Sequence, residues 1–220
     1  MSAAAAVTGA AEPVARVAPA DARRAGPLLR LAARVARHRY GAVPTPVLVA
    51  ARSRWSLRGM LAYEMAIDRA RALDVGVEDL AVLRAAEVIS CEYCRDIGRA
   101  VLAGHGDTAQ RIEAAAAGDA TGLNDLERTV LRYAEAMSNT PVMVDDAMVD
   151  ELRCHLNDEQ IVELTAAIAW ENHRARFNAA LGIVPQGFAA SCGIAAAPRS
   201  GDVVVDGSAH PLQSGEQARA

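Results

Sequence analysis

The sequence of 220 residues contains no lysine, so all 23 of its basic side chains are arginines. Without lysine, the chain cannot form a Schiff base with a substrate or supply the lysine of a phosphate-binding loop. Aromatic residues make up only 4% of the chain, and alternating runs rich in Val, Ile and Thr are scarce. Because alanine favours helices whereas β-branched and aromatic residues favour strands, this alanine-rich chain is expected to be all-α.

Long apolar runs are also missing, since no stretch reaches the roughly 18 consecutive apolar residues that span a bilayer. No basic segment followed by a long apolar one stands near the N-terminus, so we expect a cytoplasmic protein without a membrane partner. The net charge of −4 gives no electrostatic reason to expect nucleic acid as a partner. The arginine-rich, acid-poor segment 16–39 loosely resembles a transit peptide, but we interpret it as an amphipathic first helix.

Periodicity and composition divide the chain into a central helical domain and two ends. We expect a flexible leader over residues 1–26, a helical domain over 27–188, and a small, polar, aperiodic tail over 189–220. The domain is predicted to be one compact bundle. Its helices are predicted to run from Pro27 to before Gly41, and over about 56–72, 78–89, 91–103 and 157–181.

Capping side chains mark where several of these helices begin. Ser90 is predicted to cap the helix over 91–103, because serine accepts hydrogen bonds from free N–H groups at a helix start. Three pairs resemble capping boxes ahead of a periodic segment: Asp107 with Gln110, Asn124 with Glu127, and Asn157 with Gln160. The last pair begins the longest predicted helix, which Gly182 ends.

Four cysteines in a chain of this size do not indicate a disulfide scaffold, which leaves catalytic, redox or metal-binding roles. Cys91 and Cys94 are three residues apart, so on a helix they lie on one face, close enough to form a disulfide. In the first turn of a helix, free N–H groups and the helix dipole stabilise a thiolate. The pair therefore predicts thiol redox chemistry, in which one cysteine attacks and its neighbour resolves the product as a disulfide.

Two other interpretations of the pair remain open. Tetrahedral zinc needs four ligands, and the other candidates, Cys154 and His155, are adjacent and cannot easily bind one ion together, so no metal is predicted. The pair can also be two small buried apolar residues, because free cysteine packs well in protein cores. We interpret Cys154 as a packing residue and Cys192, in the tail, as incidental.

The segment DLAVLRAAEVISCEYCRDIG, residues 79–98, resembles the signature of the carboxymuconolactone decarboxylase family in its alkylhydroperoxidase D-like branch. The segments 126–137, 159–168 and 171–178 are similar to the later helices of the family, and the likeness covers about residues 27–188. The resemblance implies an all-helical fold that assembles into homo-oligomers, commonly trimers or hexamers, with the cysteine pair near a subunit interface.

The resemblance also implies reduction of a peroxide or disulfide substrate without an organic cofactor, with electrons supplied by a dithiol partner protein. The second cysteine of the family takes the peroxide oxygen and the first resolves it, which assigns these roles to Cys94 and Cys91. A glutamate and a histidine complete the family's proton relay, at positions held here by Asp79 and Gly98. We expect these two positions to meet across a helical hairpin. Glycine cannot carry a proton, and loss of general-base help costs roughly 10²–10⁴-fold in rate.

Four nearby or family-like residues are candidates for the missing proton-transfer group. Glu87 lies one turn before the first cysteine, Glu92 and Tyr93 lie between the two, and His173 belongs to a polar, family-like run. Each also has a plainer interpretation: solvated helix surface for the glutamates, a core residue for the tyrosine, and an interhelical partner for the histidine.

Three functions therefore remain open. The first is a peroxidase or thiol–disulfide oxidoreductase of peroxiredoxin type. The second is a decarboxylase-like lyase of the same family, whose chemistry does not depend on a vicinal cysteine pair. The third is a non-catalytic, redox-responsive oligomeric module, which the loss of the relay histidine at Gly98 keeps open.

Overall fold

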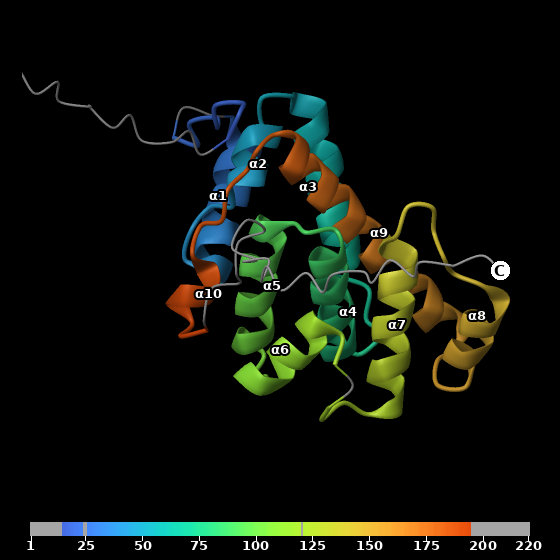
Figure 1. The fold of residues 1–220 in the computed structure, drawn as a ribbon. Coiled ribbons are helices and arrows are strands. Elements are labelled where there is room, and N and C mark those ends of the chain that lie inside the picture. Colours follow the sequence, from blue (N-terminus) through green and yellow to red (C-terminus); the bar gives the residue numbers. More distant parts are fainter. Residues whose placement is uncertain (1–14, 24–25, 120, 195–220) are drawn as a thin grey trace, which may run out of the picture.

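The computed structural model describes residues 15–23, 26–119 and 121–194, which form ten helices and no strand (Figure 1). This confirms the all-α prediction. The helices are α1 (Pro27–Tyr40), α2 (Thr45–Ala50), α3 (Arg54–Ile67), α4 (Val75–Val88), α5 (Glu92–Gly104), α6 (Ala109–Ala117), α7 (Asp125–Ser138), α8 (Asp146–Arg153), α9 (Asp158–Ala180) and α10 (Phe188–Ser191).

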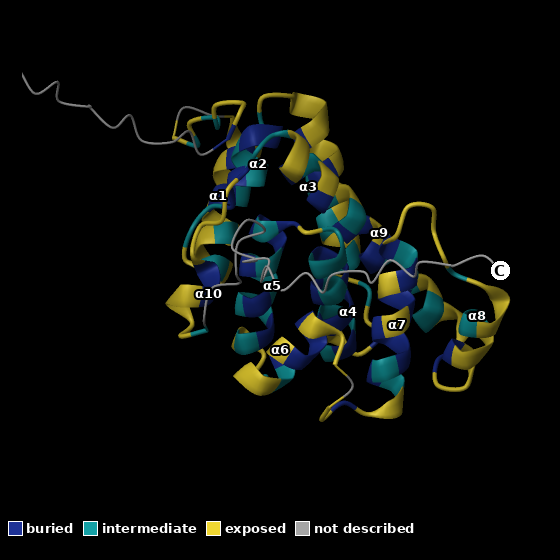
Figure 2. Ribbon diagram, viewed as in Figure 1, coloured by how far each residue is buried: buried dark blue, intermediate teal, exposed yellow. Residues whose placement is uncertain are grey.

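Helix α4 forms the centre of the bundle and packs against α5, α6, α7 and α9. Its side chains Leu80, Ala81, Leu83 and Ala85 are completely buried although they point in different directions. A helix that is apolar nearly all round is stable only inside a protein, which explains its central place. Figure 2 shows α4 largely buried, whereas α1 and α3 each expose a side to solvent.

Two of the three predicted capping boxes are present. The side chains of Asn124, at the start of α7, and Asn157, at the start of α9, each accept a hydrogen bond from the backbone N–H three residues on. Their own backbone N–H groups donate the reciprocal bond to the side chains of Glu127 and Gln160. The third prediction is wrong by one residue, because Thr108 caps α6 and its hydroxyl accepts from the N–H of Arg111. Asp107 is used differently, in an ion pair with the Arg111 side chain.

The turn between α4 and α5 corrects the predicted role of Ser90. This residue does not cap α5 but ends α4 in the left-handed region, with φ +60°. Its N–H donates to the carbonyl of Glu87, and the N–H of Cys91 donates to the carbonyl of Ala86, the pattern of a Schellman motif. Cys91 itself is the N-cap, and its sulfur accepts from the N–H of Cys94.

Contacts with the bundle extend beyond the predicted boundaries at 27 and 188. The N–H of Arg16 donates to the carbonyl of Leu181 at 2.7 Å, and the four backbone N–H groups of residues 186–189 donate to the carboxylate of Asp96 at 2.8–3.0 Å. The buried Asp96 thus holds the start of α10 against α5. The rest of the predicted leader and tail, residues 1–14, 24–25 and 195–220, lies outside the described residues.

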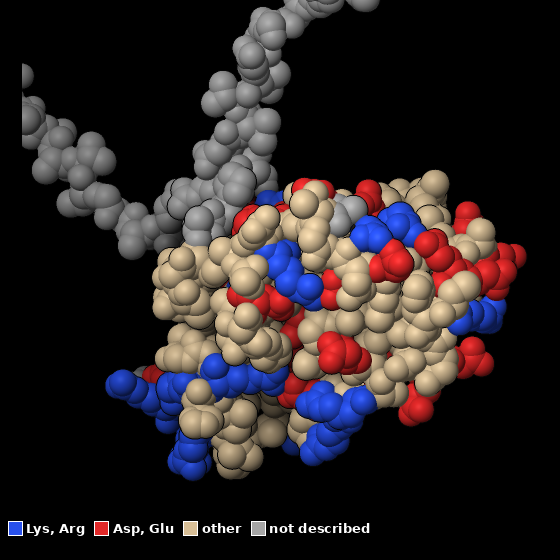
Figure 3. Space-filling model, turned by 90° about the horizontal axis from the view of Figure 1, so that it is seen from below, with Lys and Arg blue, Asp and Glu red and all other residues tan. Residues whose placement is uncertain are grey.

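Within the described residues, no helix is both long enough and apolar enough to cross a membrane. On the face shown in Figure 3, acidic and basic side chains lie interspersed among uncharged ones. This face therefore carries no broad field of one sign among the residues that the structure describes, in keeping with the small net charge.

Candidate functional site

A cavity of about 400 Å³ lies between α1, α3, α4, α5 and α9. Most of its lining is apolar and comes from leucine, valine, isoleucine, methionine and alanine side chains of these helices. Cys94 lines the cavity, although the residue is only 5% exposed, and Cys91 does not line it. The two cysteines therefore differ in access: a molecule in the cavity meets Cys94.

The cysteine pair forms a disulfide at the first turn of α5, with its Cα atoms 5.2 Å apart. Cys91 packs in an apolar cluster that includes Ala86, Ala175 and Phe188. Its sulfur accepts a hydrogen bond from the N–H of Cys94 at 3.2 Å. Since that N–H is one of the free donors of the helix start, the turn is built to stabilise negative charge on sulfur.

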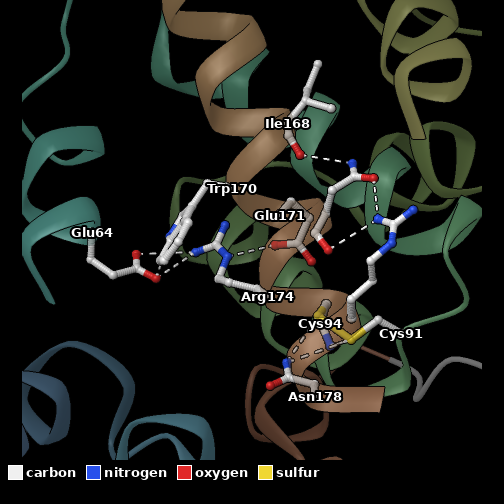
Figure 4. Close-up of polar contacts among 10 residues, drawn as sticks. Glu64, Cys91, Cys94, Ile168, Trp170, Glu171, Arg174 and Asn178 are labelled. Carbon is white, nitrogen blue, oxygen red and sulfur yellow. Dashed lines mark hydrogen bonds and ion pairs between the residues drawn. A yellow bond between two sulfur atoms is a disulfide. The ribbon is translucent and has the colours of Figure 1, made fainter. Parts of the chain in front are cut away.

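Asn178 on α9 provides the second polar contact to the sulfurs. Its side-chain N–H donates to Cys94 at 3.4 Å and lies 3.9 Å from the sulfur of Cys91 (Figure 4). Asn178 is 3% exposed, and its side-chain oxygen has no hydrogen-bond partner among the described residues. A buried amide that donates to sulfur favours the thiolate over the thiol once the disulfide is reduced.

A chain of charges, Glu64, Arg174 and Glu171, crosses the cavity from α3 to α9 (Figure 4). Arg174 contacts both carboxylate oxygens of Glu64 at 3.3 Å, and its Nε lies 2.9 Å from one oxygen of Glu171. Glu64 also accepts from the indole N–H of Trp170 at 2.9 Å. Arg174 is therefore paired with two carboxylates, Glu64 and Glu171.

Glu171 is the buried acid of the site. It is 3% exposed, and its second oxygen is buried without a hydrogen-bond partner in the described part of the chain. Burial raises the pKa of Glu171 from its ordinary 4.5 to about 7, against the opposing charge of Arg174. Such a carboxyl group exchanges a proton near neutral pH, which is the property of a general acid or base.

Comparison with known proteins shows the family of the chain. YnjA of Escherichia coli strain K12, an uncharacterised protein, is 35% identical over 168 residues, which cover 73% of this chain and 89% of YnjA. The chain belongs to the same family as YnjA. No protein-family model matches the sequence.

Solved structures show the fold of this YnjA-family protein. The debrominase Bmp8 superposes with a TM-score of 0.73 over 81% of this chain and 95% of Bmp8, at 20% identity. An alkylhydroperoxidase AhpD core, of an uncharacterised peroxidase-related protein from Ralstonia eutropha JMP134, gives a TM-score of 0.73 over 81% and 96% of the two chains, also at 20% identity. These likenesses confirm the predicted resemblance to the alkylhydroperoxidase D-like branch and its all-helical fold.

Both relay positions of the YnjA-family protein, Asp79 and Gly98, line the cavity. Asp79 lines the cavity, but its carboxylate contacts Nδ1 of His105 at 2.8 Å, two helical turns beyond Gly98. Burial raises the pKa of Asp79, and His105 opposes the rise. Gly98 instead faces Leu83, so that a Cβ at this position would lie 3.3 Å from the leucine side chain. A side chain at position 98 would therefore need Leu83 of α4 to shift by a few tenths of an ångström.

Tyr93, another residue that the sequence predicts for the site, also lines the cavity. It is 3% exposed, and its hydroxyl donates to the side-chain oxygen of Gln186 at 3.1 Å. Burial and the nearby charge of Asp96 raise the pKa of Tyr93, which keeps the phenol protonated. Because the same oxygen of Gln186 also accepts from the N–H of Thr45, Tyr93 joins α5 to the start of α2.

Glu87 and His173 lie away from the cavity lining. Glu87 forms ion pairs with Arg95 at 2.7 Å and Arg99 at 2.6 Å, so the structure gives this carboxylate a role in the charge network of α5. His173 is exposed and stacks on Trp170 with ring centroids 4.6 Å apart. Their predicted part in proton transfer stays a prediction without a contact to support it.

The remaining cysteines are both exposed thiols. The interpretation of Cys154 as a packing residue is therefore wrong, because it lies at the end of α8 where that helix meets solvent. Cys192 follows α10. In the described part of the chain, no three His, Cys, Asp or Glu side chains are grouped so as to hold a metal ion.

The sequence pattern of α9 contains a signal for the residues that line the cavity. Ala167, Glu171, Arg174 and Asn178 follow the spacing i, i+4, i+7, i+11, which places them on one face of a helix, and all four line the cavity. Three of these residues are polar although they share a buried face with an alanine, which indicates that this face lines a polar part of a cavity inside the core.

Proposed function

We propose that this YnjA-family protein is a dithiol reductase, which reduces an organic hydroperoxide held in the cavity. Cys94 is the attacking thiol and Cys91 the resolving thiol. The observation that carries the proposal is access, because Cys94 lines the apolar cavity and Cys91 does not. This assignment agrees with the roles that the sequence resemblance implies.

The reaction balances in two steps. The thiolate of Cys94 attacks the terminal oxygen of the hydroperoxide, the O–O bond breaks, and the alkoxide takes a proton to leave as an alcohol. Cys94 is then a sulfenic acid. The thiol of Cys91 attacks its sulfur, forms the disulfide and releases water. Two electrons pass from the two thiols to the peroxide.

Local geometry supports a reactive thiolate at Cys94. The residue lies in the first turn of α5, where the positive end of the helix dipole favours an anion, although the backbone N–H of Cys94 itself donates to the sulfur of Cys91. The amide of Asn178 adds a direct hydrogen bond to its sulfur. These groups stabilise the thiolate without the histidine that is replaced by Gly98.

The cavity favours a small, mainly apolar peroxide over hydrogen peroxide. A volume of about 400 Å³ holds an aromatic or short-chain alkyl group, and its apolar walls gain from contact with such a group. Return of the disulfide to the dithiol needs two electrons, which we assign to a dithiol partner protein in the reducing cytoplasm. Self-assembly into a homo-oligomer is part of the same proposal.

Stopped-flow consumption of cumene hydroperoxide by the reduced protein tests the proposal. We expect wild type to consume one equivalent and form the disulfide, Cys91→Ser to consume one equivalent without forming it, and Cys94→Ser to lose at least about 100-fold in rate. The matched control is Cys154→Ser, which removes an exposed thiol and leaves the rate unchanged.

Wild-type rates in Cys94→Ser would contradict the proposal. Lactone decarboxylation that survives loss of both thiols would favour the lyase, and a disulfide that cycles with donor dithiols but reduces no peroxide would favour the redox-responsive module.

A second candidate is reductive removal of halogen from a small aromatic ring. The fold matches that of the debrominase Bmp8, of which a cysteine-to-alanine variant has been solved with 2,3,4-tribromopyrrole at a TM-score of 0.72 to this chain. A dithiol and an aryl bromide would give the dehalogenated ring, bromide, a proton and the disulfide. Release of bromide from tribromopyrrole by wild type but not by Cys94→Ser would establish this reaction.

A further inference from the structure

We propose that Glu171 determines substrate specificity: its free oxygen accepts a hydrogen bond from an O–H or N–H group of an uncharged substrate, and the cavity rejects anions. This inference rests on the proposed function, because it concerns the molecule that Cys94 attacks. It names a substrate class within organic peroxides, namely neutral molecules with an apolar body and a hydrogen-bond donor at the end away from the peroxide.

Position along α9 separates the recognition end of the cavity from the reactive end. Asn178 contacts the sulfur of Cys94, and Glu171 lies seven residues earlier on the same face, roughly 10 Å along the helix axis. That offset separates the two backbone positions, so the two side chains enter the cavity wall one above the other on the same helix face. Glu171 therefore contacts a bound substrate at a point of the cavity wall other than the thiol, which meets the reacting atom.

The two oxygens of Glu171 have different surroundings. One lies 2.9 Å from Nε of Arg174, which fixes the carboxylate in place. The other is buried without a hydrogen-bond partner among the residues described. A buried carboxylate oxygen left without a donor is costly, so a substrate that supplies an O–H or N–H recovers the lost hydrogen bond.

Charge around the cavity opposes anions. Five carboxyl groups line it, and only two guanidinium groups, those of Arg39 and Arg174, accompany them. Both guanidinium groups are already paired: Arg39 with Asp68 at 2.8 Å, and Arg174 with Glu64 and Glu171. A carboxylate-bearing substrate would therefore meet excess negative charge in a site with largely apolar walls, where repulsion is only weakly screened.

A matched pair of peroxides tests the inference: cumene hydroperoxide with a para carboxylate group, and its methyl ester. The two differ in charge at the end away from the peroxide. At pH 8 Glu171, with a pKa of about 7, is ionised. We expect kcat/KM of wild type to be roughly 10- to 100-fold higher for the ester. The carboxylate substrate should have the higher KM and a similar kcat, because the charge affects binding and not the attacked O–O bond.

The variant Glu171→Gln is expected to reverse part of this preference. Its amide oxygen keeps the contact with Arg174, so its NH₂ group faces the cavity as a donor in place of an acceptor. We expect the KM of the carboxylate substrate to fall about 10-fold. The KM of a para-hydroxymethyl substrate, which has a hydrogen-bond donor, should rise by a similar factor. Glu159→Gln removes an exposed carboxylate from the same helix and serves as the control that changes neither.

The outcomes separate the inference from the function on which it rests. Equal kcat/KM for the two substrates in wild type overturns the inference and leaves the peroxidase proposal standing. An unchanged ratio in a folded Glu171→Gln variant also overturns it. If wild type reduces neither substrate while its dithiol is intact, the proposed function fails, and the specificity inference fails with it.

Discussion

Asn178 and Glu171 lie on one face of α9 and have different roles in the site. The first contacts the sulfur of Cys94, and the second has a buried oxygen without a hydrogen-bond partner among the described residues. The sequence predicts the cysteines because a C-x-x-C spacing has few uses, but asparagine and glutamate are common on helices. Their roles become visible only when burial on both sides of α9 is known, which depends on contacts far apart in the sequence.

The hydrogen bond from Asn178 is expected to lower the pKa of the Cys94 thiol. Removing a hydrogen bond to a charged group costs about 1.5–3 kcal/mol, which corresponds to roughly 1–2 pKa units. In a Cys91→Ser background, Asn178→Ala is predicted to raise the thiol pKa by this amount, and Asn178→Asp to raise it further, because the aspartate adds negative charge. The pH dependence of iodoacetamide alkylation measures it. Identical pKa values in the three proteins would show that the contact has no electrostatic effect.

The raised pKa of Glu171 predicts a pH dependence of stability. Between about pH 4.5 and 7 the folded protein holds a proton at Glu171 that the unfolded chain has lost. The free energy of unfolding therefore falls as the pH rises through this window and levels off above it. Glu78, whose pKa burial also raises to about 7, adds a change of the same sign.

Glu171→Gln is expected to flatten this dependence, because the amide does not titrate. Melting temperatures at pH 5, 6, 7 and 8 for wild type, Glu171→Gln and the control Glu159→Gln provide the comparison. The same slope in wild type and Glu171→Gln would refute the buried, titrating carboxyl group.

At the scale of elements, the sequence predicts the helices with clear end signals well and their connections poorly: the predicted helix over 56–72 runs five residues past the end of α3 at Ile67. The prediction for α1 agrees with the structure, and that for α9 agrees within one residue at each end, because proline, capping boxes and glycine mark their ends. The short helices α2, α8 and α10 were not predicted. Helices this short lack stability of their own, and α10 begins where Asp96 of α5 binds its first N–H groups, a contact that no local pattern reveals.

Ser90 is the position where an element boundary carries strain. A non-glycine residue in the left-handed region destabilises the folded protein by roughly 1–2 kcal/mol. Ser90 adopts this conformation because α4 must end directly before the cysteines. Ser90→Gly is predicted to keep or slightly raise stability, and Ser90→Val to lower it by about 1–2 kcal/mol. Urea denaturation measures both. A valine variant as stable as wild type would mean that the turn adopts another conformation.

The whole molecule has apolar surface that a single copy leaves exposed. Five large apolar side chains on α1, α3 and α9 are more than half exposed: Leu31, Val35, Trp55, Met65 and Val162. Two of these helices, α1 and α3, also wall the cavity, so association through them would close the site from outside. The resemblance to the alkylhydroperoxidase D-like branch predicts such an assembly, although the sequence does not reveal which faces meet.

We predict that the protein is a homo-oligomer and that Trp55→Asp shifts it towards the monomer, because a charge in an apolar contact disfavours association. Light scattering after size-exclusion chromatography measures the mass. Val142→Asp is the control, since Val142 is 60% exposed in the connection between α7 and α8. A wild-type mass of one chain at micromolar concentration would contradict the prediction.

The central claim is that Cys94 meets the peroxide and Cys91 resolves the product. Mass spectrometry of the reduced Cys91→Ser protein, treated with one equivalent of cumene hydroperoxide in the presence of dimedone, tests it most directly. Dimedone traps sulfenic acids. The account predicts a single adduct on Cys94, and little or none on the exposed thiols of Cys154 and Cys192. An adduct distributed over the exposed thiols with Cys94 unmodified would contradict it.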